Sequence, residues 1–170
     1  MNRMMMITAL AVTAIACSKG GGTAKAMLEP KSGTQVTGDA SFTQEGGKVV
    51  VVINAKSLPP GKHGVHVHEK GDCSASDASS AGAHFAPGGG EHAGLDDPKR
   101  HAGDLGNLEA SADGTALMTV TTDALTVGGG DHDVVGKSII IHGDPDDLKT
   151  QPSDNSGGRI ACGVIKKAEG

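Results

Sequence analysis

The sequence predicts an all-β domain, either a sandwich or a barrel. Short segments rich in Val, Ile and Thr alternate with Gly- and Pro-containing turns, at the spacing typical of such folds. Beyond the N-terminal segment, no stretch shows a sustained helical periodicity. The chain has no Trp, no Tyr and two Phe, so its core has to consist of Val, Ile, Leu and Ala. A length of 170 residues is enough for one domain with a substantial core.

Eight segments are predicted to be strands. In chain order they are Thr23–Leu28, Gln35–Gln44, Lys48–Lys56, His63–Glu69, Leu108–Ala112, Thr115–Thr122, Gly136–His142 and Ile160–Lys166. Turn residues separate several of them, as at Pro59-Pro60-Gly61 and Asp113-Gly114. Three segments are too long to be hairpin turns, namely residues 70–103, 123–135 and 143–158. Loops of that length are usually functional or disordered.

The N-terminal segment predicts export. Arg3 precedes an apolar stretch, residues 4–16, that is too short to span a bilayer and ends in small residues before Cys17. This pattern resembles a bacterial lipoprotein signal. We therefore expect residues 1–16 to be a cleaved signal peptide, Cys17 to be lipidated, residues 17–26 to form a flexible tether and residues 27–170 to form the domain. An ordinary secretory signal cut nearby is the alternative.

Either signal exports the mature protein to the periplasm or cell envelope, with a lipid on Cys17 as its one expected membrane contact. The chain has three cysteines, Cys17, Cys73 and Cys162. If Cys17 carries lipid, Cys73–Cys162 is the disulfide that remains in an oxidising compartment. It would enclose 88 residues, for which the chain-entropy model gives about 4–5 kcal/mol of stabilisation. Two free buried thiols are the alternative.

The charge pattern excludes one class of partner. The formal net charge is −5 and the chain contains no basic run. Nucleic acid is therefore not expected as a partner.

The histidines predict metal binding. On a strand, the side chains of His66 and His68 point to the same face and can converge on one ion. The other candidate ligands are His84, His92, His101, Asp104 and His142. Of the two remaining histidines, His63 is expected to hydrogen-bond nearby backbone, and His132, between two aspartates, is expected to be a solvated loop residue.

Seven candidate ligands indicate two metal sites. Three histidines with one carboxylate form a closed zinc site, with bonds of about 2.0–2.1 Å. Four imidazoles without a thiolate suit copper. Two four-coordinate sites need eight ligands, so one residue has to serve both. If that residue is His84, its ring bridges the ions as an imidazolate, which two nearby dications make feasible.

Five motifs carry a family resemblance. They are Gly64-Val65-His66-Val67-His68-Glu69, Gly71-Asp72-Cys73, Ser80-Ala81-Gly82-Ala83-His84-Phe85-Ala86-Pro87, His101-Ala102-Gly103-Asp104-Leu105-Gly106-Asn107-Leu108 and Gly158-Arg159-Ile160-Ala161-Cys162-Gly163-Val164-Ile165. In this order, over about residues 23–166, they resemble the copper/zinc superoxide dismutases. A cysteine soon after the histidine pair is similar to the bacterial branch. The resemblance implies an eight-stranded antiparallel Greek-key β-barrel, which is related to the immunoglobulin-like sandwich. It also implies long metal-binding and active-site loops.

The resemblance also implies roles for individual residues. It implies copper at His66, His68, His84 and His142, zinc at His84, His92, His101 and Asp104, and a Cys73–Cys162 disulfide. Asp146 matches an aspartate that hydrogen-bonds a copper and a zinc histidine, here His66 and His92, and such groups orient ligand rings. Arg159 matches the active-site arginine, whose forked donors suit a small anion. Lys149 is a weaker candidate for attracting that anion from further out.

The implied reaction is the disproportionation of superoxide, 2 O2− + 2 H+ → O2 + H2O2. Copper would alternate between Cu(II) and Cu(I), and His84 would release copper on reduction and take up the proton for the second superoxide. Zinc is not redox-active and would hold His84. The sequence departs from the family at Ala86, commonly Asn, and in lacking the aromatic residues that bacterial members often use at a dimer interface. A monomer and a homodimer therefore both remain open.

Two other functions compete with a dismutase. A copper buffer or carrier on the same fold would bind metal without turnover, but it would not need the complete ligand set together with Arg159. A zinc hydrolyase such as carbonic anhydrase also uses two histidines separated by one residue plus a distant one. That function would leave His84, His92 and Asp104 unexplained.

Overall fold

A computed structural model describes residues 21–153 and 155–169 of the chain. The strands are β1 Thr23–Pro30, β2 Thr37–Glu45, β3 Lys48–Lys56, β4 Gly61–His68, β5 Asp104–Ala110, β6 Ala116–Thr122, β7 Ser138–His142, β8 Arg159–Val164 and β9 Lys166–Lys167. One 3-10 helix, η1, spans Ser79–Ala81. All eight predicted strands are present. The predicted signal peptide and Cys17 lie outside the described residues.

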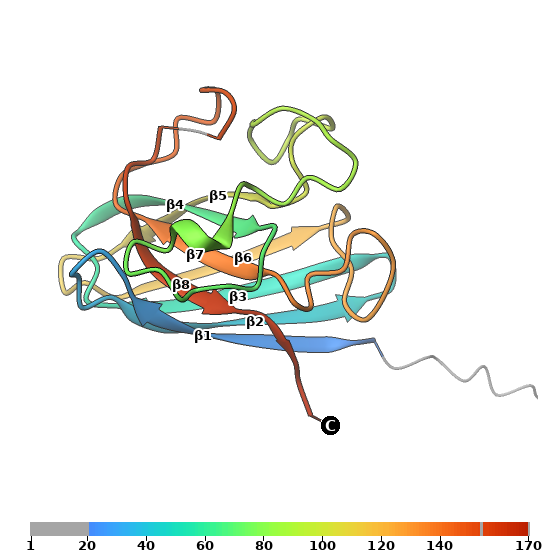
Figure 1. Ribbon diagram of the computed structural model, residues 1–170, viewed down its shortest axis with the longest axis horizontal. Coiled ribbons are helices and arrows are strands. Elements are labelled where there is room, and N and C mark those ends of the chain that lie inside the picture. The colour runs from blue at the N-terminus through green and yellow to red at the C-terminus, as the bar shows by residue number, and fades with distance from the viewer. Residues whose placement is uncertain (1–20, 154, 170) are drawn as a thin grey trace, which may run out of the picture.

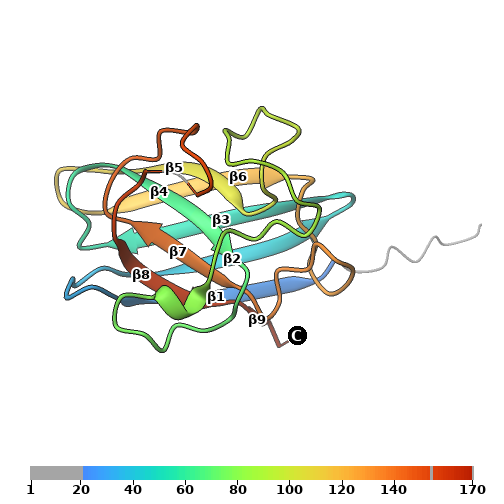
Figure 2. The ribbon, with the colours of Figure 1, turned by 45° about the horizontal axis from the view of Figure 1, so that its top comes forward.

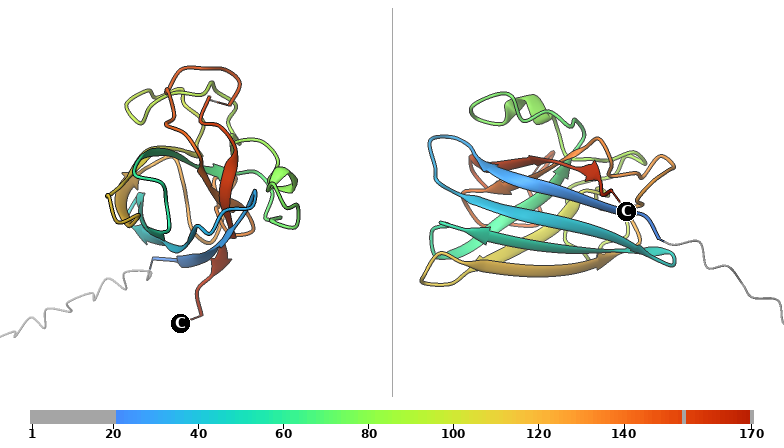
Figure 3. Two further views of the ribbon diagram at one scale, coloured as in Figure 1. Left: turned by 90° about the vertical axis from the view of Figure 1, so that its left-hand side faces the viewer. Right: turned by 90° about the horizontal axis from the view of Figure 1, so that it is seen from below.

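The eight long strands form a nearly closed antiparallel barrel (Figure 3). Their order around it is β5-β4-β7-β8-β1-β2-β3-β6, and a hairpin joins the two end strands, β5 and β6. The connections from β3 to β4 and from β6 to β7 each pass from one half of the sheet to the other, as in a Greek key (Figure 1). This architecture confirms the fold class that the sequence predicted.

Alternation of side chains explains why these segments become strands. In β3, Val49, Val51 and Ile53 are fully buried inside the barrel, and the residues between them are half-buried or exposed. Phe42 and Leu108 pack into the same core. Each fully buried side chain of this size contributes about 1.5–3 kcal/mol. A shift of the register by one residue would expose this whole set, so the apolar pattern fixes the pairing.

Several boundaries differ from the prediction, and strand pairing explains three of these differences. β1 begins at Thr23, so residues 23–26 of the expected tether belong to the barrel, where they pair with β2. β5 begins at Asp104 rather than Leu108, because Asp104 pairs with His66 beyond an irregularity in the register. Strand β8 ends at Val164 rather than Lys166, and Lys166–Lys167 form the separate strand β9, which pairs with β1.

Two long loops cover one side of the barrel. The first loop (residues 69–103) and the second loop (residues 143–153 and 155–158) both lie over β4, β7 and β8, which run side by side (Figure 2). A disulfide between Cys73 and Cys162 ties the first loop to β8, with 5.8 Å between the Cα atoms. The predicted disulfide is therefore confirmed. No helix among residues 21–153 and 155–169 has the length and apolar character needed to cross a membrane.

Candidate metal centre

Strand β4 supplies the first two candidate ligands. Val65 and Val67 point into the barrel core and are fully buried. His66 and His68, on the opposite face, are also fully buried, because the two long loops cover them. The neighbouring strands fix their positions, since His66 pairs with Ile140 of β7 and His68 pairs with Ser138.

Four histidines converge above β4. The nitrogens that could bind a metal in His66, His68, His84 and His142 lie within 4.8 Å of one another, and all four residues are buried. The rings of His66 and His84 are stacked, with centroids 4.1 Å apart, and the ring of His142 lies 4.8 Å from that of His66. The structure thus brings together the residues predicted to bind copper.

The other predicted ligands gather around one carboxylate oxygen. The Nδ1 atoms of His84, His92 and His101 lie 2.8, 3.1 and 3.5 Å from Asp104 Oδ1. Ligand atoms bound at about 2.0–2.1 Å to one tetrahedral ion lie roughly 3.3 Å apart. His101 lies at the edge of the cluster, since the group whose atoms fall within 4.8 Å of one another consists of His66, His84, His92 and Asp104. His66 and His84 belong to both groups.

Gly103 lets the first loop approach β4 closely enough to deliver these ligands. Its N–H donates to the Phe85 carbonyl at 2.9 Å, and its own carbonyl accepts from Val67 N–H at 2.9 Å. A Cβ at this position would collide with the Val67 carbonyl oxygen. A residue larger than glycine would therefore displace His101, two residues before Gly103, and Asp104, which follows it directly.

Hydrogen bonds set which ring nitrogen faces each group. His68 Nδ1 donates to the Gly82 carbonyl at 3.0 Å, so its Nε2 carries the lone pair. That Nε2 is buried and has no hydrogen-bond partner among the described residues, and the same holds for His101 Nδ1. Buried polar atoms normally have partners. A metal ion at these atoms would supply them, so the donor set fits copper and zinc.

Asp146 connects the two groups from the second loop. Its Oδ2 accepts from His66 Nε2 at 2.9 Å and its Oδ1 accepts from His92 Nε2 at 2.8 Å. Asn107 of β5 holds the main chain of Asp146 through two hydrogen bonds, of 2.7 and 2.9 Å. Asp146 therefore orients both rings so that their Nδ1 atoms face the ligand groups.

The electrostatics follow from burial and these hydrogen bonds. Burial lowers the pKa of His68 well below its usual value, so its lone pair is available at neutral pH. Burial also opposes the charged form of His92, but hydrogen bonds to Asp104 and Asp146 outweigh this and raise the pKa of His92 to about 10. Although burial alone would raise the pKa values of Asp104 and Asp146, their histidine partners hold both well below the usual range.

Arg159 lies at the mouth of the histidine cluster. It lines a hollow of about 290 Å³ together with His84, His142, Ser153, Asn155 and other residues of the second loop. Its guanidinium also donates to the carbonyls of Ala78 and Gly82, at 2.8 and 2.7 Å. Arg159 is thus a brace for the first loop as well as a cation at the mouth. Lys149 does not line this hollow among the described residues, so its expected part in attracting the anion gains no support.

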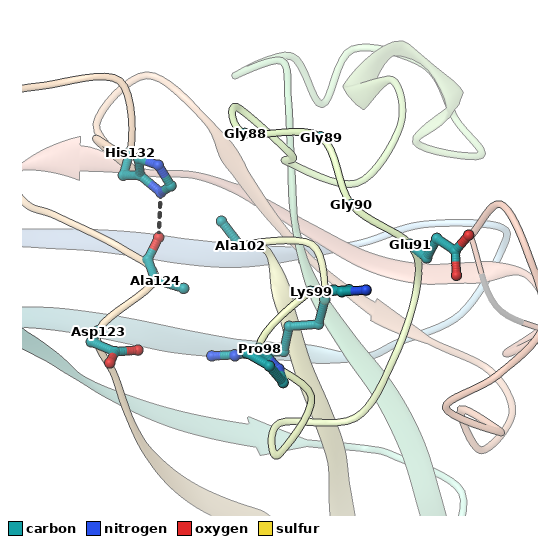
Figure 4. A pocket seen from close by; sticks show the side chains of 11 residues that line it. Gly88, Gly89, Gly90, Glu91, Pro98, Lys99, Ala102, Asp123, Ala124 and His132 are labelled. Atoms are coloured by element: carbon teal, nitrogen blue, oxygen red, sulfur yellow. Dashed lines mark hydrogen bonds between the residues drawn. The ribbon is translucent and has the colours of Figure 1, made fainter.

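The two remaining histidines have structural positions. His63 is buried and its two ring nitrogens face the carbonyls of His142 and Pro59, at 2.9 and 2.8 Å. His132 is half-buried and bonded to the Ala124 carbonyl at 2.7 Å, so the expectation of a solvated residue is wrong. It lines a hollow of about 780 Å³ outside both ligand groups (Figure 4).

Sequence reasoning missed two carboxamides that support the site, Asn107 and Gln151. Asn107 holds the main chain of Asp146, and the Gln151 side chain bonds to the main chain of His92 at 2.7 and 2.8 Å. Asn107 stands within one of the quoted motifs, three residues after Asp104, which could have drawn attention to it. Gln151 lies in an irregular loop and carries no comparable signal.

Comparisons with known proteins agree with this geometry. A family model described as copper/zinc superoxide dismutase (SODC) matches residues 36–165, which is more than half of the chain. Among solved structures, the chain is similar to the one titled as a crystal structure analysis of the clock protein EA4. That match has a TM-score of 0.79 and 35% sequence identity, and it covers 88% of this chain and 97% of the other.

Proposed function

The chain belongs to the copper/zinc superoxide dismutase family, and from this we propose which of its residues carry the reaction and where it takes place. The family is a class of oxidoreductases that bind copper and zinc and disproportionate superoxide. What we propose is the residue assignment: copper at His66, His68, His84 and His142, and zinc at His84, His92, His101 and Asp104.

This assignment depends on the position of His84. His66 and His84 both belong to the two groups of converging ligand atoms, but His66 Nε2 is bonded to Asp146, whereas His84 Nδ1 lies 2.8 Å from Asp104, on the zinc side. Its other nitrogen, Nε2, then serves the copper side. An imidazole that offers one nitrogen to each group supplies the eighth ligand that two four-coordinate sites need.

The surrounding residues prepare the site for superoxide. Copper, when bound, supplies the one-electron chemistry, by which one superoxide is oxidised to O2 and a second is reduced and takes up two protons to give H2O2. His84 Nε2 is the position from which we infer that one of these protons is delivered. Arg159 offers positive charge at the mouth, and Asp146 holds His66 and His92 in place. The barrel and the loops bury all six candidate histidines, and His66, His68 and His92 are fully buried.

Metal content and activity of the purified mature protein test this proposal. We expect one copper and one zinc per chain, with fast dismutation of superoxide. His84→Ala should lose both the activity and the magnetic coupling between Cu(II) and cobalt placed at the zinc site. Wild-type protein that binds both metals without turnover would instead be a copper carrier. Independent magnetic behaviour of the two ions would contradict the shared histidine.

For the cellular setting, we propose defence against superoxide outside the cytoplasm. The N-terminal pattern of a short apolar segment before Cys17 supports it, as do the adjacent polar residues and the disulfide. Mass spectrometry of the mature protein should find Cys17 at the N-terminus with a diacylglyceryl-type mass. A mature N-terminus elsewhere, with Cys17 lost or free, would contradict lipid anchoring.

A further inference from the structure

The second loop contacts the zinc group through Gln151. The side-chain Nε2 of Gln151 donates to the carbonyl of His92 at 2.7 Å, and the N–H of His92 donates to Gln151 Oε1 at 2.8 Å. A carboxamide carries a donor and an acceptor side by side, like a peptide group. This pair therefore reproduces the double hydrogen bond that two antiparallel strands exchange.

His92 is consequently held at both ends by one loop. Its ring donates to Asp146 Oδ1 at 2.8 Å, and its peptide groups bond to Gln151, five residues further along. The opposite ring nitrogen, Nδ1, lies 3.1 Å from Asp104 Oδ1 and is buried. Because ring and main chain are both fixed, Nδ1 has one direction in which it can point.

We propose that Gln151 is a positioning residue that aims His92 at zinc, an inference that rests on the zinc assignment made above. A third hydrogen bond, from Nε2 to the Lys149 carbonyl at 3.1 Å, keeps the amide turned toward His92. Gln151 as a whole is exposed, so its aliphatic part adds little to the core. Its contribution therefore lies in the amide, and removing the amide frees the His92 peptide groups to rotate and carry the ring with them.

A second glutamine provides a matched control. The Gln44 amide also makes three hydrogen bonds to main chain, donating to Gly46 and Lys48 at 3.1 and 3.0 Å and accepting from Val127 at 2.9 Å. None of these partners is a candidate ligand. Gln44→Met thus removes the same chemical group from the fold without touching the metal centre.

The experiment measures zinc binding to the metal-free full-length protein by competition with a chelator. Gln151→Met, which keeps the side-chain volume, should weaken zinc binding about ten-fold, the lower end of the 10–100-fold range for groups that orient ligands. It should also alter the visible absorption of cobalt bound at the same site and speed up hydrogen exchange of the His92 amide. Gln44→Met should leave zinc affinity and the cobalt spectrum unchanged. The side chain of Gln151→Asn is too short to reach His92, so this variant should behave as Gln151→Met does. It replaces Gln151→Met in the experiment if that variant does not fold.

Three results would overturn the inference. Wild-type zinc affinity in both Gln151 variants would show that the amide does not position His92. Equal losses in Gln151→Met and Gln44→Met would show a general effect on the fold. Zinc binding that His92→Ala leaves unchanged would contradict the zinc assignment itself, and the inference with it. A loss in His92→Ala without one in Gln151→Met would contradict the inference alone.

Discussion

At the scale of single residues, hydrogen bonds fix which ring nitrogen of each histidine faces a ligand group. His68, His66 and His92 each donate from one nitrogen to a carbonyl or carboxylate oxygen, which turns the other nitrogen toward a ligand group. The nitrogen that faces each ligand group is therefore oriented before a metal arrives. Preorganisation of this kind is worth 10–100-fold in metal affinity.

Zinc binding should release a proton from His92. Its pKa is raised to about 10 in the metal-free protein, so the ring is protonated at neutral pH and zinc has to displace the Nδ1 proton. Zinc affinity should therefore rise with pH, about ten-fold per unit between pH 7 and 9. Calorimetry in buffers with different ionisation enthalpies should count about one proton per zinc. No proton release would contradict a charged His92. In the metal-free protein, the raised pKa stabilises the fold fully below about pH 6.5, and this contribution is lost as the pH rises through about 10.

Replacing Arg159 by Lys and by Ala should separate its two roles. Lysine keeps the charge but cannot donate to both the Ala78 and the Gly82 carbonyl in the same fork. We expect Arg159→Ala to lower the dismutation rate roughly ten-fold or more, as when local steering is lost, and Arg159→Lys to lower it less. Copper affinity should fall somewhat in both, because Gly82 also orients His68. Full activity in Arg159→Ala would exclude an electrostatic role.

At the scale of elements, β4 and the first loop form one unit. Strand β4 is buried on both faces from His63 onward, because the barrel core takes its valines and the loops cover its histidines. The first loop returns to β4 at Phe85 and Gly103, whose main-chain groups bond to Val67. The loop ligands are thereby fixed relative to the strand ligands, although no regular strand carries them.

Removal of the disulfide should weaken this unit at its copper side. Cys73 and Cys162 fix the start of the first loop, which contains Gly82, the hydrogen-bond acceptor of His68. The variant Cys73→Ala with Cys162→Ala should lose about 2–5 kcal/mol of unfolding free energy, measured by denaturant titration. Copper affinity should fall more than zinc affinity, since the zinc ligands lie further along the loop. Equal losses for both metals would contradict this division.

At the scale of the whole molecule, the negative net charge of the protein repels the anionic substrate. The formal charge is −5, and loss of residues 1–16 with their one charged side chain, Arg3, would make it −6. Superoxide is an anion, so fast capture requires a positive field confined to the mouth. Arg159 is the cationic side chain that lines this hollow among the described residues.

The dismutation rate should therefore fall as salt is added. The Debye length shortens from about 30 Å at 0.01 M to about 10 Å at 0.1 M, which screens attraction to the mouth. A titration with an inert salt, followed by pulse radiolysis, measures the slope. Arg159→Glu should flatten or reverse it. A wild-type rate that rises with salt would show that the overall negative charge outweighs the local field.

The strands and the chemistry of the candidate ligands can be predicted from the amino-acid sequence. Alternating burial and turn residues are local signals, so all eight long strands could be predicted, with errors at their ends. The spacing of His66 and His68 placed both on one face for the same reason. Strand β3, for example, was predicted with the bounds that it has, Lys48–Lys56.

The way in which the loops hold these ligands could not be predicted from the sequence. Gln151 meets His92 across 59 residues of chain, and Arg159 meets Gly82 across 77. Such contacts depend on how two irregular loops lie against the barrel. Neither loop has a repeating pattern from which that arrangement can be derived. The same limit explains why β5 begins at Asp104, since its pairing with His66 is a long-range contact, and why Arg159 braces carbonyls in addition to facing the mouth.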